Sequence, residues 1–270
     1  MASLMQGNAK QNVMTVDIED WYQGISRYTE VQSPSPRLGQ SLGKVLELLK
    51  KHDSTATFFI LGEVATKFPE LVEEIVAGGH EVGCHGFRHV HVVDLGRDAF
   101  DKELSDATRL LERICREKLL SFRAAFFSLT KETSWILDTI RKHGYIYDSS
   151  IFPTHHPFYG VPNAPDHPYR PSFSNIEAED ENGGVVEFPI LARKYLGVNV
   201  PLGGGAYLRF LGNKPVASAI KKRNEEGWPA TIYIHPWELD DFVPDVKLGR
   251  FIKYVTFHNI GKVRVTSSRS

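Results

Sequence analysis

The sequence predicts an α/β fold in which parallel strands, forming an open sheet or a barrel, are linked by crossover helices. Two observations predict it: short β-rich runs alternate with helical patterns, and groups of polar and charged side chains stand where several of these runs end. Neither an internal repeat nor a break in composition marks a second domain. We therefore predict one domain over residues 13–265, preceded by residues 1–12 as a stretch that is disordered or foreign to the domain.

The individual elements follow from local composition. A run rich in Pro, His, Asn, Asp and Gly cannot hold a helix and predicts a long ordered surface loop over residues 153–184. Runs of β-branched and aromatic residues predict strands at 13–18, 56–62, 80–85, 119–126, 145–152, 185–190 and 230–235. Apolar residues at helical spacing predict helices near 39–51, 68–78, 97–116, 131–143 and 214–226.

Composition excludes several classes of partner. With 32 basic and 33 acidic side chains and a net charge of -1, the chain lacks a field that gathers phosphates, so nucleic acid and anionic membranes are poor partners. The two cysteines carry no CxxC spacing, which argues against a disulfide framework or a cysteine-based zinc knuckle. No apolar run is long enough to cross a bilayer and no signal peptide is seen, so we expect a soluble, cytoplasmic protein.

The segment DIEDW, which closes the first predicted strand, carries three carboxylates within four residues. Such charges repel one another, and a sheet has no structural reason to hold them unless a cation or a proton compensates. Strand alternation places Asp17 and Glu19 on one face, whereas Asp20 falls at the turn. The alternative is a solvated strand end or a helix N-cap.

A second group lies in HGFRHVH, where His85 and His89 stand four residues apart. On a helical turn both imidazoles face the same way and can reach one metal ion. Two nitrogens and one carboxylate from DIED would make a three-ligand site of the kind expected for catalytic zinc. Position 86 is not Glu, which excludes the HExxH zincin motif, and His91 is most simply a loop residue.

Two further strand ends carry candidate residues. Arg123 lies in the apolar string FRAAFF and needs a carboxylate partner if buried, which the DIED segment could supply. His235 ends the last strand in IYIHPWELD, where Trp237 would form an apolar wall. Asp148, at the end of another strand, could orient and charge that imidazole and make it a general acid.

Taken together, these motifs resemble the polysaccharide deacetylase family, the carbohydrate esterase group with the NodB homology domain. The resemblance runs from TVDIEDW through ATFFILG, HEVGCHGFRH, FRAAFF and YDSSIFP to IHPWELD, in the same order and with similar spacing. The wording of VDIEDW, DSSIFP and HPWELD is similar to the branch associated with exosortase and exopolysaccharide loci. The implied fold is a distorted (β/α) barrel in a single domain.

The resemblance also implies roles for individual residues. Asp17 would be the general base, held by Arg123, and His235 the general acid, tuned by Asp148. Asp20, His85 and His89 would bind a divalent metal ion, for which zinc is the expected identity. The backbone N–H of Phe126 would face the oxyanion, and the substrate would be an N-acetylated glycan.

Two departures from the family pattern concern these roles. Ala125 replaces a proline of the usual third motif, so the loop that aims the oxyanion amide loses a fixed φ. DIED also contains one more residue than the commoner pair of adjacent aspartates. If Glu19 and Asp20 align with that pair, Glu19 becomes the base and Asp17 a supporting group.

Two other functions remain open at this point. Metal-independent relatives similar to allantoinase hydrolyse a small cyclic amide on the same fold, but they lack the full ligand set. A catalytically silent glycan-binding protein is the other alternative, and Ala125 is its only support in the sequence.

Overall fold

The computed structural model describes residues 11–156 and 159–261. The predicted disorder of residues 1–10 and the end of the predicted domain at 262–265 lie outside this range. Asn12, the last residue of the predicted N-terminal stretch, lies against the domain, since its side-chain oxygen accepts a 2.9 Å hydrogen bond from the Ala230 N–H. Within the described range, none of the helices is both long and apolar enough to cross a membrane.

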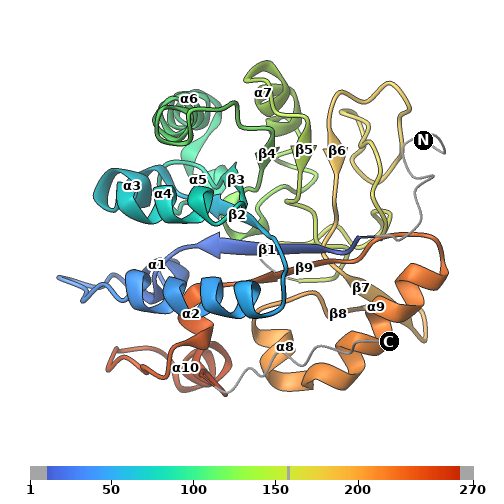
Figure 1. Ribbon diagram of the computed structural model, residues 1–270. Coiled ribbons are helices and arrows are strands. Elements are labelled where there is room, and N and C mark those ends of the chain that lie inside the picture. Colours follow the sequence, from blue (N-terminus) through green and yellow to red (C-terminus); the bar gives the residue numbers. More distant parts are fainter. Residues whose placement is uncertain (1–10, 157–158, 262–270) are drawn as a thin grey trace.

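The core of the protein is one sheet of seven parallel strands in the order β6-β5-β4-β3-β2-β1-β9, which confirms the predicted α/β class (Figure 1). A separate antiparallel hairpin, which the sequence did not predict, is formed by β7 and β8. The strands are β1 (Val13–Ile18), β2 (Thr57–Ile60), β3 (Glu81–Cys84), β4 (Ser121–Phe122), β5 (Tyr147–Asp148), β6 (Val186–Glu187), β7 (Ala192–Tyr195), β8 (Val198–Pro201) and β9 (Thr231–Ile234).

Helices surround the strands (Figure 1). The five predicted helices are confirmed as α2, α4, α6, α7 and α9, whereas α1, α3, α5, α8 and α10 were not predicted. Four of these five have only four to six residues, too few for a periodic pattern to be detected. The helices are α1 (Trp21–Gly24), α2 (Leu38–Lys51), α3 (Gly62–Lys67), α4 (Pro69–Ala77), α5 (Val92–Leu95), α6 (Arg97–Cys115), α7 (Ile136–Lys142), α8 (Ala206–Leu211), α9 (Asn213–Glu225) and α10 (Arg250–Phe257), with 3-10 turns at Ala125–Phe127 and Pro236–Leu239.

The sheet curls into a distorted barrel. Its open side, between β6 and β9, is narrowed by two isolated parallel bridges, Ile190 to Thr231 and Gly204 to Tyr233. Gly204 is required at its bridge, since an added Cβ would lie 2.3 Å from the Tyr233 carbonyl oxygen. The predicted single domain with a distorted (β/α) barrel is therefore confirmed.

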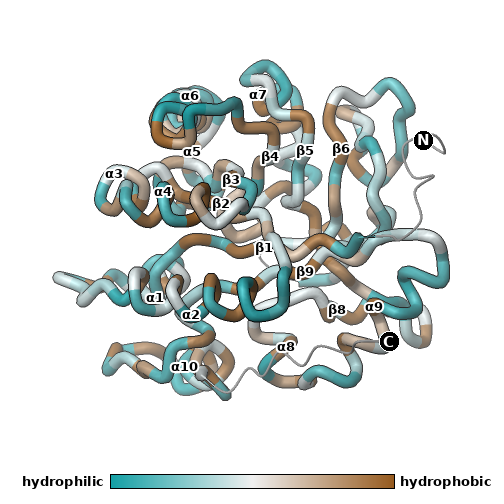
Figure 2. Tube along the Cα trace, viewed as in Figure 1, coloured by the Kyte–Doolittle hydropathy of each residue, from teal (hydrophilic) through white to brown (hydrophobic). Residues whose placement is uncertain are grey.

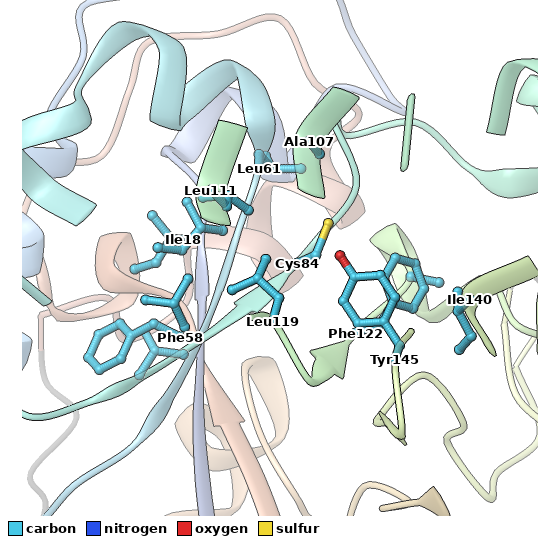
Figure 3. Close-up of a cluster of buried hydrophobic side chains, with 14 of the residues drawn as sticks. Ile18, Phe58, Leu61, Cys84, Ala107, Leu111, Leu119, Phe122, Ile140 and Tyr145 are labelled. Atoms are coloured by element: carbon cyan, nitrogen blue, oxygen red, sulfur yellow. The ribbon is translucent and has the colours of Figure 1, made fainter. Parts of the chain in front are cut away.

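The two faces of the sheet have different roles. The face toward the helices is apolar, and Ile18, Phe58 and Cys84 pack there against Leu111 of α6 (Figure 3). Polar and apolar residues alternate around α2 and α6, as expected for helices with one face on a sheet (Figure 2). Because side chains alternate along a strand, Asp17, the neighbour of Ile18, points to the opposite face and into the barrel.

Closure of the barrel at Gly204 can be tested by substitution. Gly204→Ala should lower the free energy of unfolding by about 1–3 kcal/mol, because the new methyl group overpacks against the backbone of β9. Chemical denaturation would measure this. The control is Gly43→Ala in α2, where an added Cβ meets no atom within 4 Å and should stabilise the helix. Equal effects at both positions would contradict the close approach.

Candidate metal and acid–base site

Four of the candidate residues gather at one edge of the sheet, because the carboxyl ends of parallel strands meet there. Glu19 follows β1, His85 follows β3, Arg123 follows β4 and His235 follows β9. All but His235 are almost completely buried, and the His235 side chain is 17% exposed. The site is therefore closed on most sides and reaches solvent at His235.

Arg123 and Asp17 form an ion pair inside the barrel, with 2.6 Å between Nη1 and Oδ1. The guanidinium is completely buried, and it also donates hydrogen bonds to the Thr15 hydroxyl and to the carbonyl and hydroxyl oxygens of Ser149. The ring of Phe59 lies 4.3 Å from its central carbon. Asp17 is thus the carboxylate partner that the sequence required for a buried Arg123.

Next to this pair, Glu19, His85 and His89 form a cluster whose potential ligand atoms all lie within 4.8 Å of one another. The closest approach is 2.8 Å, between Glu19 Oε2 and His89 Nε2. Burial raises the pKa of Glu19, but His89 and His235 lower it to about 2, so this carboxylate is ionised.

Hydrogen bonds fix the tautomers of both histidines. Nδ1 of His85 lies 2.9 Å from the carbonyl oxygen of Arg123, and Nδ1 of His89 lies 3.0 Å from that of Gln23. A carbonyl oxygen only accepts, so both Nδ1 atoms carry the hydrogen and a neutral ring presents its Nε2 lone pair to the cluster. Burial also lowers the pKa of His85 to about 4, which keeps this ring neutral.

This donor set fits a divalent metal ion. Glu19 Oε2 is buried and has no hydrogen-bond partner in the described part of the chain, although an imidazole nitrogen faces it. Two lone pairs at that distance require a positive charge between them, either a proton or a cation. A pair of Nδ1-anchored imidazoles with one carboxylate is the arrangement that zinc sites use.

Asp20 occupies a different place from the one predicted. Its Oδ1 accepts the Trp21 N–H at the start of α1, and its Oδ2 accepts the N–H groups of Arg37 and Leu38 at the start of α2. The Asp20 carboxylate therefore caps two helices. Glu19, rather than Asp20, lies beside His85 and His89. The geometry agrees with the helix-cap alternative for Asp20, because Glu19 continues the inward face of β1 while Asp20 begins the turn.

His235 faces Glu19 from the other side, with 3.1 Å between Nε2 and Glu19 Oε1. The Trp237 ring stacks on the imidazole at 5.2 Å, as the predicted apolar wall. Burial lowers the pKa of His235, but the carboxylates of Glu19 and Glu238 raise it to about 9. The imidazole is therefore positively charged at neutral pH.

Asp148 does not take the predicted position beside His235. Its Oδ1 accepts a 2.5 Å hydrogen bond from the Ser150 hydroxyl, and that hydroxyl accepts the Ala124 N–H. Asp148 also faces Glu187, and burial raises the pKa of both carboxyls, with that of Glu187 well above its usual value. Asp148 therefore supports the backbone before Ala125, and the carboxylate beside His235 is Glu238.

Phe126 lies in a left-handed turn, with φ of 56° at Phe126 and 51° at Phe127. Its ring lies 4.1 Å from that of His89, and its N–H has no hydrogen-bond acceptor within residues 11–156 and 159–261. An L-residue with positive φ is strained by roughly 1–2 kcal/mol. The strained turn places the Phe126 ring beside His89 although Ala125 replaces the family proline.

Sequence reasoning missed Glu238 as a site residue. The signal was present in HPWEL, since a proline followed by glutamate three residues after the histidine is a helix-start pattern that brings the glutamate back to the first residue. From the sequence, Glu19 is an alternative to Asp17 as the base or to Asp20 as the metal ligand. Its position beside the two histidines depends on the exact direction of the chain after β1.

These features define a parallel-strand barrel with a carboxylate–histidine cluster that could hold a metal ion and a charged histidine beside it. Residues 34–147 match a family model described as polysaccharide deacetylase, and residues 149–266 match one described as a domain of unknown function (DUF3473). Residues 34–147 therefore belong to the polysaccharide deacetylase family.

Individual relatives agree with this assignment. The chain is 32% identical over 101 residues to a chitooligosaccharide deacetylase of Azorhizobium caulinodans, which is 37% of this chain and 47% of that protein. The match thus spans less than half of the relative. A putative polysaccharide deacetylase from Mycobacterium smegmatis shares the fold, with a TM-score of 0.53 and 18% identity over 86% of this chain and 79% of its own. The PuuE allantoinase structure also shares the fold, with a TM-score of 0.55 and 16% identity, over 83% of this chain and 76% of that one.

The choice between Glu19 and Asp20 can be tested by metal analysis. If Glu19 is a direct ligand, Glu19→Gln should weaken zinc binding by more than the ~10–100-fold that loss of a supporting contact costs. Asp20→Asn should keep full metal content and instead lower stability by about 1–3 kcal/mol, since a buried helix-cap acceptor is lost. Zinc titration and thermal melting of both variants would decide, and the opposite pattern would return Asp20 to the site.

The buried acid pair predicts a pH dependence of stability. The pKa of Glu187 in the folded protein lies well above its ordinary value of 4.5. As the pH rises above 4.5, the unfolded chain therefore loses this proton while the folded protein still holds it, and the free energy of unfolding decreases. Glu187→Gln resembles the protonated form, and its melting temperature relative to wild type should therefore increase with pH. The exposed Glu181→Gln variant is the control, and parallel curves for all three proteins would refute the assignment.

Proposed function

We propose that this protein is a metal-dependent hydrolase that removes N-acetyl groups from an N-acetylated oligosaccharide or polysaccharide. The observation that carries the proposal is the Glu19, His85 and His89 cluster beside a buried carboxylate, Asp17, in a chain whose residues 34–147 belong to the polysaccharide deacetylase family. The name of the Azorhizobium relative, a chitooligosaccharide deacetylase, supports an oligosaccharide of N-acetylglucosamine as the first substrate to test.

Glu19, His85 and His89 would hold the ion, and two nitrogens with one oxygen suit zinc. When bound, such an ion supplies a Lewis acid that polarises a carbonyl group and activates water. His85 and His89 are held by their Nδ1 hydrogen bonds, so their Nε2 atoms need no reorientation. Asp17 rather than Glu19 is the proposed base, because Glu19 lies in the cluster with His85 and His89.

The remaining roles follow from protonation and from unpaired groups. Asp17 forms the buried ion pair with Arg123 and would accept a proton from the attacking water. His235 carries a proton on Nε2 in its charged form and would donate it to the departing amine. The Phe126 N–H, which has no acceptor among the residues that the structure describes, would donate a hydrogen bond to the oxyanion.

The acid role of His235 predicts a dependence on the leaving group. His235→Gln should lower kcat for acetate release from chito-oligosaccharides by about 10²–10⁴-fold, because an amine leaves only after protonation. The loss should be much smaller for an aryl acetate, whose phenolate departs without a proton. Metal content should stay unchanged, and His52→Gln, outside the site, is the control.

The outcomes separate the possible failures. Acetate release that is equally impaired on both substrates would assign His235 a different role. Wild-type protein that holds zinc but releases no acetate would overturn the proposed reaction and leave the metal site standing. Wild-type protein that hydrolyses allantoin without metal would instead support the cyclic amide alternative.

A further inference from the structure

A buried ion pair lies directly behind His235. Arg209 of α8 donates from Nε to Glu238 Oε1 at 2.9 Å, and each side chain is 2% exposed. Burying two charges is costly, and removal of one partner alone typically costs about 3–5 kcal/mol. Such a pair contributes little to net stability compared with apolar packing. Stability alone therefore does not explain why this ion pair lies against His235.

Glu238 holds His235 at two points with one oxygen. Its Oε2 accepts the backbone N–H of His235 at 3.0 Å and lies 3.3 Å from Nδ1 of the same residue. Pro236 begins the 3-10 turn between them, which fixes the backbone that brings Glu238 back to His235. With Nδ1 facing Glu238, the ring is oriented so that Nε2 faces Glu19 at 3.1 Å.

Arg209 is itself anchored to the last helix. Its Nη1 donates to the carbonyl oxygen of His258 at 2.7 Å, just after α10, and that of Val255 lies 3.5 Å away. These contacts use carbonyl groups that the end of a helix leaves without partners. The contacts therefore run from α10 through Arg209 and Glu238 to His235, entirely within residues 149–266.

We infer that Glu238, supported by Arg209, is the positioning residue for His235, and that this is what the segment of unknown function adds to the site. The inference rests on the proposed acid role of His235. The polysaccharide deacetylase match ends at residue 147, before His235, so the two histidines of the cluster and the proposed acid come from different matched segments, and Glu19 precedes both. The alternative supporter expected from the sequence, Asp148, is engaged with Ser150.

The test combines kinetics with a signal that does not depend on activity. In the full-length zinc-loaded protein, the Nδ1 proton of His235 should give a slowly exchanging NMR resonance, assigned by its absence in His235→Gln. Glu238→Ala should remove this resonance and lower kcat on chito-oligosaccharides by about 10–100-fold with KM and metal content little changed. Glu238→Gln keeps an oxygen acceptor and should restore the resonance and part of kcat.

Glu226→Gln is the matched control, because Glu226 also pairs with arginines, Arg193 and Arg223, in the same segment but away from His235. A resonance that persists in Glu238→Ala, or a kcat no lower than that of Glu226→Gln, would overturn the inference. If Glu238→Ala does not fold, Glu238→Gln decides, since loss of the resonance there would contradict a bond from Nδ1 to this oxygen. If the wild type releases no acetate, the proposed function fails while the resonance still tests the positioning.

Discussion

The buried ion pair between Arg123 and Asp17 is the constraint on which the rest of the site depends. Arg123 links three strands, since its guanidinium reaches Asp17 and Thr15 of β1 and Ser149 after β5, while its own chain follows β4. Its carbonyl oxygen also accepts the Nδ1–H of His85. One residue therefore fixes the carboxylate proposed as base and the orientation of one proposed metal ligand.

The same position explains why the charge is tolerated. Every other face of the guanidinium is covered by hydrogen-bond acceptors or by the rings of Phe59, Phe127 and Tyr233, with ring centroids 4.3–5.7 Å from its central carbon. A protein tolerates a buried arginine whose hydrogen-bond acceptors are all in place, whereas removal of one charged partner strongly destabilises the fold. The barrel interior thus surrounds a charged group, and the main apolar core of the protein lies on the other side of the sheet.

The two matched segments of the chain form one structure. Residues 34–147 supply β2 to β4, the first residue of β5 and both histidines of the cluster. Residues 149–266 supply β6 and β9, the strands on either side of the opening, together with His235. Strand β1, with Asp17 and Glu19, precedes both matches and pairs with β2 and β9. Neither segment holds the whole site, so the proposed base, Asp17, and the proposed acid, His235, come together only when the sheet is assembled.

Alternating strand and helix patterns are local properties of a few residues, so they were enough to predict the α/β class. The sequence also indicated which strand ends carry the candidate site residues, and it required a carboxylate for Arg123. The partners of these residues are set by the folded chain. Asp20 became a helix cap and Glu19 joined the histidines because the chain turns sharply after β1, and Glu238 took the place expected for Asp148 because a proline-initiated turn returns it to His235. Contacts of this kind depend on chain direction over one or two residues, which composition and spacing do not fix.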